Sequence, residues 1–209
     1  MKWLLSILIC TVILTACSDS DGINQQAAET ANKQHTAGGL AELKPENIAG
    51  YDEKVDIHTI GMALEKAGVA QGQQKESEWN RRLAAAKNDA DFKAVLNEQL
   101  HFYRQARDAL SGLKMNSEKG RRIHEHLSGG FGGVTGMLET LQTIDLTSPE
   151  GMVTANAAKS QMQQYALDIA QGMQMWIDMM KENNYDIDKA AEAEFREKMQ
   201  AVEKNVEIK

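Results

Sequence analysis

From residue 51 onward, apolar residues recur at spacings of three and four, which is the period of an amphipathic helix. No run alternates apolar and polar residues in the manner of a strand, and the chain has only two prolines, Pro45 and Pro149. A first helical segment weakens between Gly68 and Gly72 and then resumes. Its apolar positions are Ile57, Ile60, Leu64, Ala67, Trp79, Leu83 and Ala86.

Residues that favour helix ends mark two further segments. Asn88 is a good N-cap for a second helix, with acids in the first turn behind it. A third helix is predicted to start after Asn116-Ser117 and to end near Leu146. The apolar positions of these two segments are Phe92, Leu96, Tyr103, Ala106, Leu110 and Leu113, then Ile123, Leu127, Val134, Leu138 and Leu141, with Gln99 at an intervening core position.

A fourth segment opens at Thr147-Ser148-Pro149-Glu150, because a hydroxyl cap followed by proline is a specific helix start. Asn183-Asn184 ends it, and Asp188 is expected to cap a smaller fifth segment. The fourth segment carries a regular seam of Met162, Tyr165, Ile169, Met173, Trp176 and Met180, and the fifth carries Ala191, Phe195, Met199, Val202 and Val206.

Short connections between long amphipathic helices favour antiparallel neighbours. The pattern therefore predicts an all-α domain over residues 52–208, an up-and-down bundle of four main helices plus a smaller one. The alternation of three and four predicts left-handed, nearly parallel packing. Residues 17–50 are polar and poor in large apolar side chains, so we expect them to form a flexible tether in front of the bundle.

Residues 1–16 have the layout of a secretory signal peptide: Lys2, then a nearly unbroken apolar run, then small residues. The run is too short to span a bilayer comfortably, because a spanning helix needs about 20 apolar residues. The polar segment after Cys17 also lacks the basic flank expected of a retained cytoplasmic-side anchor.

The end of this leader, Leu14-Thr15-Ala16-Cys17, resembles the lipobox of bacterial lipoproteins, an aliphatic residue, two small residues and a cysteine. The resemblance implies cleavage between Ala16 and Cys17, a diacylglyceryl group on the Cys17 sulfur, and an anchor of two or three acyl chains, which holds stably where one would not. The alternative is an ordinary secretion signal followed by a chance cysteine.

Residues that follow the lipidated cysteine carry sorting information in Gram-negative lipoproteins, and here they are Ser18 and Asp19. Serine at the first position does not resemble an inner-membrane retention signal. The resemblance therefore implies a lipid-anchored protein of the cell outer membrane, with the direction in which the domain faces left open. In a Gram-positive source, the same anchor would sit on the outer leaflet of the plasma membrane.

Charge and cysteine content exclude several classes of function. Removing Lys2 with the leader from the 23 basic residues leaves 22 against 30 acidic ones, a net charge of −8. An acidic body argues against nucleic acid or an anionic membrane surface as the main partner. Since Cys10 leaves with the leader and Cys17 carries lipid, the mature chain has no thiol for disulfides, nucleophilic catalysis or thiolate metal sites.

The segment Gly129–Gly136 holds five glycines in eight residues, each costing a helix interior about 1 kcal/mol relative to alanine. Three interpretations remain open. The glycines allow two helices to approach closely, which is the interpretation we favour, or the helix breaks at Gly129-Gly130, or the backbone approaches a flat ligand. Nearby His124 and His126 are two residues apart, so they point away from each other on a helix and a structural role is preferred for both.

Methionine is abundant, and Met175 and Met179 lie four apart, with Ile177 nearby, on a face different from the main seam. This second apolar face indicates either a central helix or a surface that binds a partner. Methionine also ligates Cu(I) and haem iron. No pattern typical of a catalytic site or a phosphate-binding loop occurs, and we predict no catalytic residues, no metal ligands and no cofactor.

Together these features lead to one main hypothesis, a non-enzymatic envelope lipoprotein whose bundle acts as a binding or scaffolding module. Its partner would be another protein or a second copy of the chain. The partner would meet either the face of Met175, Ile177 and Met179 or the glycine-rich helix. The alternative is a haem or copper carrier that uses methionine and histidine in the bundle.

Overall fold

The computed structural model describes residues 50–146 and 148–187, and beyond them residues 189, 192–193, 195–197 and 199–200. Every element assigned in these ranges is a helix, which confirms the all-α fold class. The elements are α2 (Tyr51–Lys66), the 3-10 turn η4 (Val69–Gln71), α3 (Gly72–Ala85), α4 (Asp89–Leu110), α5 (Glu118–Thr143) and α6 (Pro149–Glu182). None of them combines the length and the apolarity that crossing a bilayer requires.

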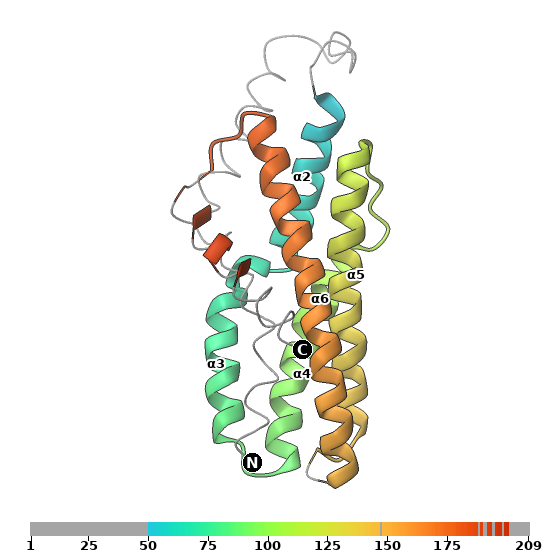
Figure 1. Cartoon of the computed structure of the whole chain (residues 1–209), viewed down its shortest axis with the longest axis vertical. Helices are drawn as coiled ribbons and strands as arrows, with labels where there is room; N and C mark the ends of the chain where they lie inside the picture. Colours follow the sequence, from blue (N-terminus) through green and yellow to red (C-terminus); the bar gives the residue numbers. More distant parts are fainter. Residues whose placement is uncertain are drawn as a thin grey trace.

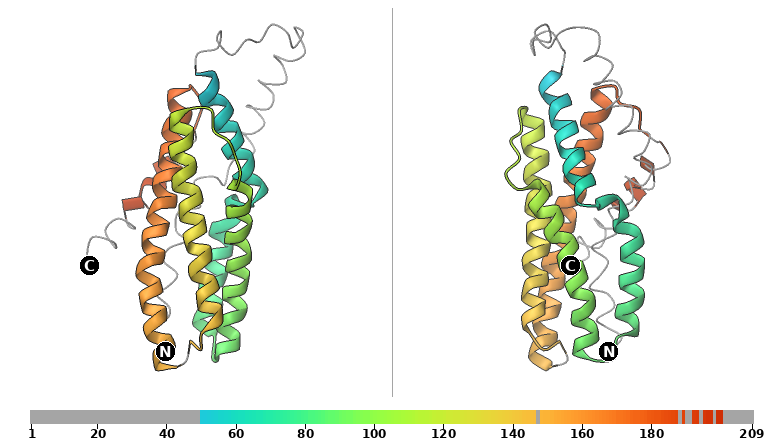
Figure 2. Two further views of the ribbon diagram at one scale, coloured as in Figure 1. Left: turned by 90° about the vertical axis from the view of Figure 1, so that its right-hand side faces the viewer. Right: turned by 180° about the vertical axis from the view of Figure 1, so that it is seen from behind.

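The three longest helices, α4, α5 and α6, run up and down in succession and form the body of the bundle (Figure 1). The most extensive packing joins α5 to α6, which lie side by side along most of their lengths (Figure 2). Helix α2 packs at one end against α4, α5 and α6, whereas α3 packs against α4 toward the other end. The first predicted segment is thus two helices, separated at Gly68, whose φ of 69° is left-handed.

The predicted helix starts are confirmed by their caps. The side chains of Asn88 and Ser117 accept hydrogen bonds from the backbone N–H groups of Asp91 and Gly120, three residues ahead. Ser148 caps α6 in the same way, with Pro149 at the first helical position.

One of the predicted helix ends differs from the end found in the structure. Helix α5 ends at Thr143, a few residues before the expected Leu146, because Ile144 is already extended at φ −104° and ψ 155°. Asn183 ends α6 as expected. The cap predicted at Asp188 lies outside the described residues.

The apolar seams predicted for the first four segments contribute to one core, whereas Ala191, Val202 and Val206 of the fifth lie outside the described residues. On α5 all five predicted seam residues are at most 1% exposed, and Gln99 on α4 is buried among apolar side chains at 3%. Three aromatic pairs among the described residues form a chain of contacts from α3 through α4 to α5, each with ring centroids no more than 6.0 Å apart. They are Trp79 with Phe102, Phe102 with Tyr103, and Tyr103 with Phe131.

Candidate functional site

The predicted interaction face on α6 is not an exposed surface. Ile177 is 4% exposed and Met179 is 1% exposed, while Met175 is partly buried against the core. The reason is that α6 packs against α2 as well as α5, so it needs two apolar faces. The indole N–H of Trp176 also donates to the Ile57 carbonyl of α2 at 3.3 Å. The prediction of a docking face here is therefore corrected to the other interpretation of this pattern, a central helix.

The glycine-rich segment forms a continuous part of α5, so the alternative in which the helix breaks at Gly129-Gly130 is wrong. Two of its glycines face α6. A methyl group on Gly130 would lie 2.5 Å from Ile169 Cγ1 and 2.8 Å from the Tyr165 carbonyl oxygen, and one on Gly133 would overlap the Tyr165 ring. On α6, a methyl group on Gly172 would lie 2.9 Å from Leu127. These glycines allow the close α5–α6 crossing that the sequence favoured.

The other three glycines of the segment have no such role within the described chain. A methyl group on Gly129, Gly132 or Gly136 would meet no atom within 4 Å. They are spaced three and four apart and therefore share one side of α5, which we call the outer glycine face. Gly129 is exposed and the other two are partly exposed.

Several of the histidines and methionines considered for haem or copper lie within the packing of the bundle. His124 Nε2 lies 2.9 Å from the Leu110 carbonyl oxygen, a contact that joins α5 to the end of α4. Met173, Met179 and Met180 are at most 3% exposed and pack in the core. Among the described residues, no three His, Cys, Asp or Glu side chains are grouped closely enough to hold a metal ion.

A buried carboxylate on α2 is the main polar site that the sequence pattern did not reveal. Asp56 is fully buried, and each of its oxygens accepts two hydrogen bonds. The donors are the backbone and side chain of Asn116 and of Ser117, at 2.7–3.1 Å. Gly120 makes room for the carboxylate, because a methyl group there would overlap it. The feature of the sequence that could have indicated this site is an acidic residue next to Ile57, on the apolar side of a predicted helix.

Charged side chains join α2, α5 and α6 at the same end of the bundle. Lys119 pairs with Glu53 at 3.2 Å and with Glu182. The Asn183 amide donates to Glu53 at 2.7 Å, and this hydrogen bond, with help from Lys119, lowers the pKa of Glu53 against the opposing effect of burial. Hydrogen bonds to Glu182 and Glu53 raise the pKa of Lys119. The cluster fastens three helices to one another.

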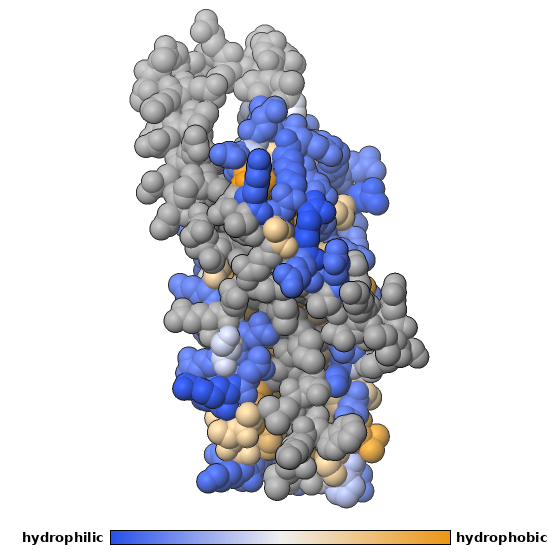
Figure 3. Space-filling model, turned by 60° about the vertical axis from the view of Figure 1, so that its left-hand side comes forward, coloured by the Kyte–Doolittle hydropathy of each residue, from blue (hydrophilic) through white to orange (hydrophobic). Residues whose placement is uncertain are grey.

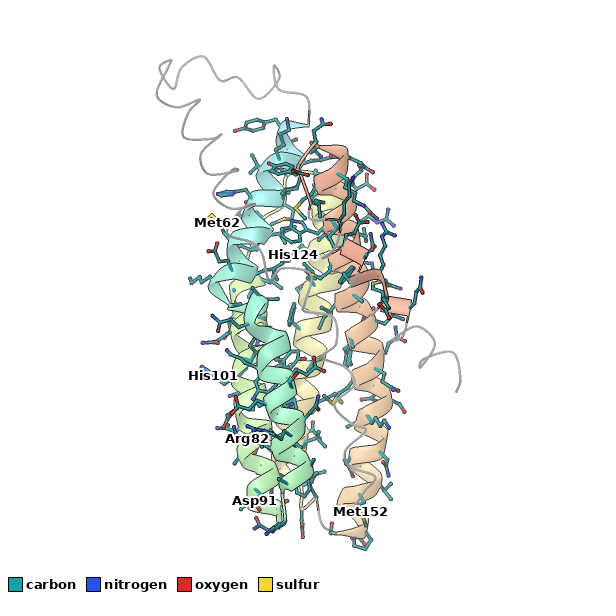
Figure 4. The ribbon with its side chains drawn as sticks, turned by 90° about the vertical axis from the view of Figure 1, so that its left-hand side faces the viewer. Met62, Arg82, Asp91, His101, His124 and Met152 are labelled. Atoms are coloured by element: carbon teal, nitrogen blue, oxygen red, sulfur yellow. The ribbon has the colours of Figure 1, made fainter. Side chains whose placement is uncertain are left out.

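Large apolar side chains that are exposed in the described chain are few and scattered. Met62 is 56% exposed on α2, and Met152 and Val153 are 44% and 71% exposed near the start of α6. Met62 and Met152 lie toward opposite ends of the bundle (Figure 4). The coloured surface in Figure 3 is largely hydrophilic, with small hydrophobic areas near its upper and lower ends.

Leu14, Thr15, Ala16 and Cys17, the lipobox residues, lie outside the described residues. Comparison of the chain with protein-family models, with curated proteins and with solved structures finds no match.

Proposed function

We propose that the chain is a lipoprotein of the bacterial cell envelope, anchored through Cys17, whose helical bundle is a non-enzymatic binding or scaffolding module. The observation that carries the proposal is the complete lipobox Leu14-Thr15-Ala16-Cys17 directly after an apolar run with a basic start. Two or three acyl chains on one residue give a stable anchor. Ser18 and Asp19 favour the outer membrane over the inner one.

The surface that we propose for the partner is the outer glycine face of α5. Each glycine in a helix interior costs about 1 kcal/mol relative to alanine. Gly130 and Gly133 offset that cost by letting α6 approach, whereas Gly129, Gly132 and Gly136 meet nothing in the described chain. A helix of another protein, or of a second copy, would find a surface there that permits close backbone approach.

The anchor is tested by the intact mass of protein extracted from bacterial membranes with detergent. We expect a chain that begins at Cys17 and carries the additional mass of two or three acyl chains. A chain that begins elsewhere, or that weighs the same as bare polypeptide, contradicts the proposal.

The partner surface is tested by crosslinking and light scattering in envelope extracts. We expect Gly132→Leu to reduce the yield of a specific crosslinked complex, because the side chain would prevent close approach. Ala157→Leu, on an exposed position of α6, is the matched control for added apolar bulk. A monodisperse monomer with no specific complex, or equal yields from both variants, would exclude this face as the partner site.

A further inference from the structure

Helix α3 lies at the margin of the bundle and is joined to it by two short connections (Figures 1 and 4). Before it, Gly68 has a left-handed φ of 69°, and a methyl group there would meet no atom within 4 Å. After it, Ala86 is extended, and α4 begins with its own cap, Asn88. Lys87 N–H also donates to Asp91 within the same turn. The start of α4 is therefore stabilised without help from α3.

The apolar attachment of α3 is small. The segment between Gly68 and Ala86 buries three apolar side chains larger than alanine in the described chain, Val69 of η4 and Trp79 and Leu83 of α3, and the last two share one side of the helix. By contrast, α4 buries Phe92, Val95, Leu96, Leu100, Phe102, Tyr103, Ala106 and Leu110. Since buried apolar area is the main stabilising contribution in such a bundle, α3 is held less firmly than α4, α5 and α6.

The ion pair that joins α3 to α4 is exposed to solvent, whereas Glu76 on the same helix is buried and has its own polar interaction within the chain. Arg82 donates two hydrogen bonds to Glu98, at 2.6 and 2.7 Å, but the two side chains are 36% and 47% exposed. The pair lowers the pKa of Glu98 and raises that of Arg82. Ion pairs this exposed are weak and are screened by salt. Figure 4 shows Arg82 on α3 in the lower half of the bundle.

The residue that α3 covers is Phe102 of α4. Phe102 is 1% exposed, with the Trp79 ring 5.6 Å away in an edge arrangement and Lys75 Nζ 5.2 Å from the ring centroid. The next aromatic contacts, from Phe102 to Tyr103 and from Tyr103 to Phe131, connect α4 to α5 and do not involve α3. Removing α3 would break only the first of these contacts.

We propose that α3 is a lid that opens as one unit, about Gly68 and Ala86, and uncovers Phe102 while α4, α5 and α6 remain packed. Cooperative opening of one helix under native conditions is typical of elements with few buried apolar contacts. The open state presents aromatic side chains of α3 and α4 that the closed state hides. This inference stands apart from the outer glycine face and holds whether or not that face binds a partner.

Amide hydrogen exchange of the full chain, resolved to single residues, tests the lid. We expect the α3 amides between Trp79 and Leu83 to exchange at least about tenfold faster than those in the middle of α5 and α6. They should also share one opening free energy, because the helix opens as a unit. A smooth rise in protection from the ends of α3 to its middle would indicate fraying and would overturn the proposal.

Two matched variants separate opening of α3 from general loosening. Arg82→Gln should accelerate exchange in α3 by about two- to fivefold and leave α5 and α6 unchanged. Arg104→Gln, which breaks an ion pair of similar exposure between α4 and α5, should not accelerate α3. Equal acceleration of every helix by Arg82→Gln, or α3 amides as protected as those of α5, contradicts the lid.

Discussion

Gly129 and Gly130 are neighbours in α5 that meet opposite environments. A methyl group on Gly130 would press on backbone atoms of Tyr165 and Ile169, whereas one on Gly129 would meet open space. Backbone atoms in a packed crossing cannot give way as a flexible side chain can. The same substitution at the two positions should therefore have effects of opposite sign.

We expect Gly130→Ala to lower the free energy of unfolding by about 1–3 kcal/mol through overpacking. Gly129→Ala should raise it by about 0.5–1 kcal/mol, because alanine favours the helix. Urea unfolding followed by circular dichroism at 222 nm measures both. Equal effects of the two variants would show that α5 does not approach α6 as described.

Asp56 is a carboxylate that the fold buries completely. Four donors surround its two oxygens, so an amide at this position would point its own N–H groups at donors. We expect Asp56→Asn to destabilise the fold by about 2–4 kcal/mol. Asp52→Asn, on an exposed position of the same helix, should change stability by less than about 0.5 kcal/mol. If chemical denaturation showed similar losses of unfolding free energy in the two variants, Asp56 would not be an important connection between α2 and α5.

At the scale of the element, α6 is apolar on two sides because it has neighbours on two sides. Met179, at 1% exposure, should behave as a core residue, and Met179→Ala should lower the free energy of unfolding by about 2–5 kcal/mol. Met62→Ala, at a position that is 56% exposed, should change it by less than about 0.5 kcal/mol. A stability unchanged by Met179→Ala would restore the interpretation of this side of α6 as a docking face.

The junction of α2, α5 and α6 should respond to acid. The pKa of Glu53 is lower in the folded chain than in the unfolded one. The contribution of Glu53 to the free energy of unfolding is therefore fully present above the unfolded pKa, and it is lost as the pH falls through the folded pKa. We expect the free energy of unfolding to fall between about pH 5 and pH 3, and less steeply in Glu53→Gln.

Asn183→Ala removes the main donor to Glu53 and is the second variant for this test. It should flatten the same part of the pH profile as Glu53→Gln. Profiles parallel to that of the unaltered chain in both variants would show that the junction does not depend on the ionised Glu53.

At the scale of the whole molecule, the proposed anchor and the bundle are separate parts of one chain. Metabolic labelling with an alkyne fatty acid should mark the unaltered protein and Cys10→Ser alike, because Cys10 lies within the predicted leader. Cys17→Ser should lose the label, because it lacks the sulfur that the lipobox resemblance assigns to the lipid. Label retained in Cys17→Ser would show that the lipid is attached elsewhere.

Much of the fold followed from the sequence because helix formation is local. The period of apolar residues and the caps Asn88, Ser117 and Ser148 depend on residues within one or two turns of each other, so the all-α class and most helix starts were predicted correctly. The same locality applies to the proposed leader, because its charge, its apolar run and its resemblance to a lipobox are read from consecutive residues.

Only the tertiary structure decided which neighbour each helix face meets. The second apolar side of α6 could have been a surface, and it is buried in a bundle where α6 packs against both α2 and α5. Five glycines looked alike in sequence, and α6 divides them into two that allow its approach and three that face outward. Asp56 looked like an ordinary helical acid until Asn116 and Ser117, far along the chain, supplied its donors. Periodicity specifies that a face is apolar, but contacts between distant residues specify what covers it.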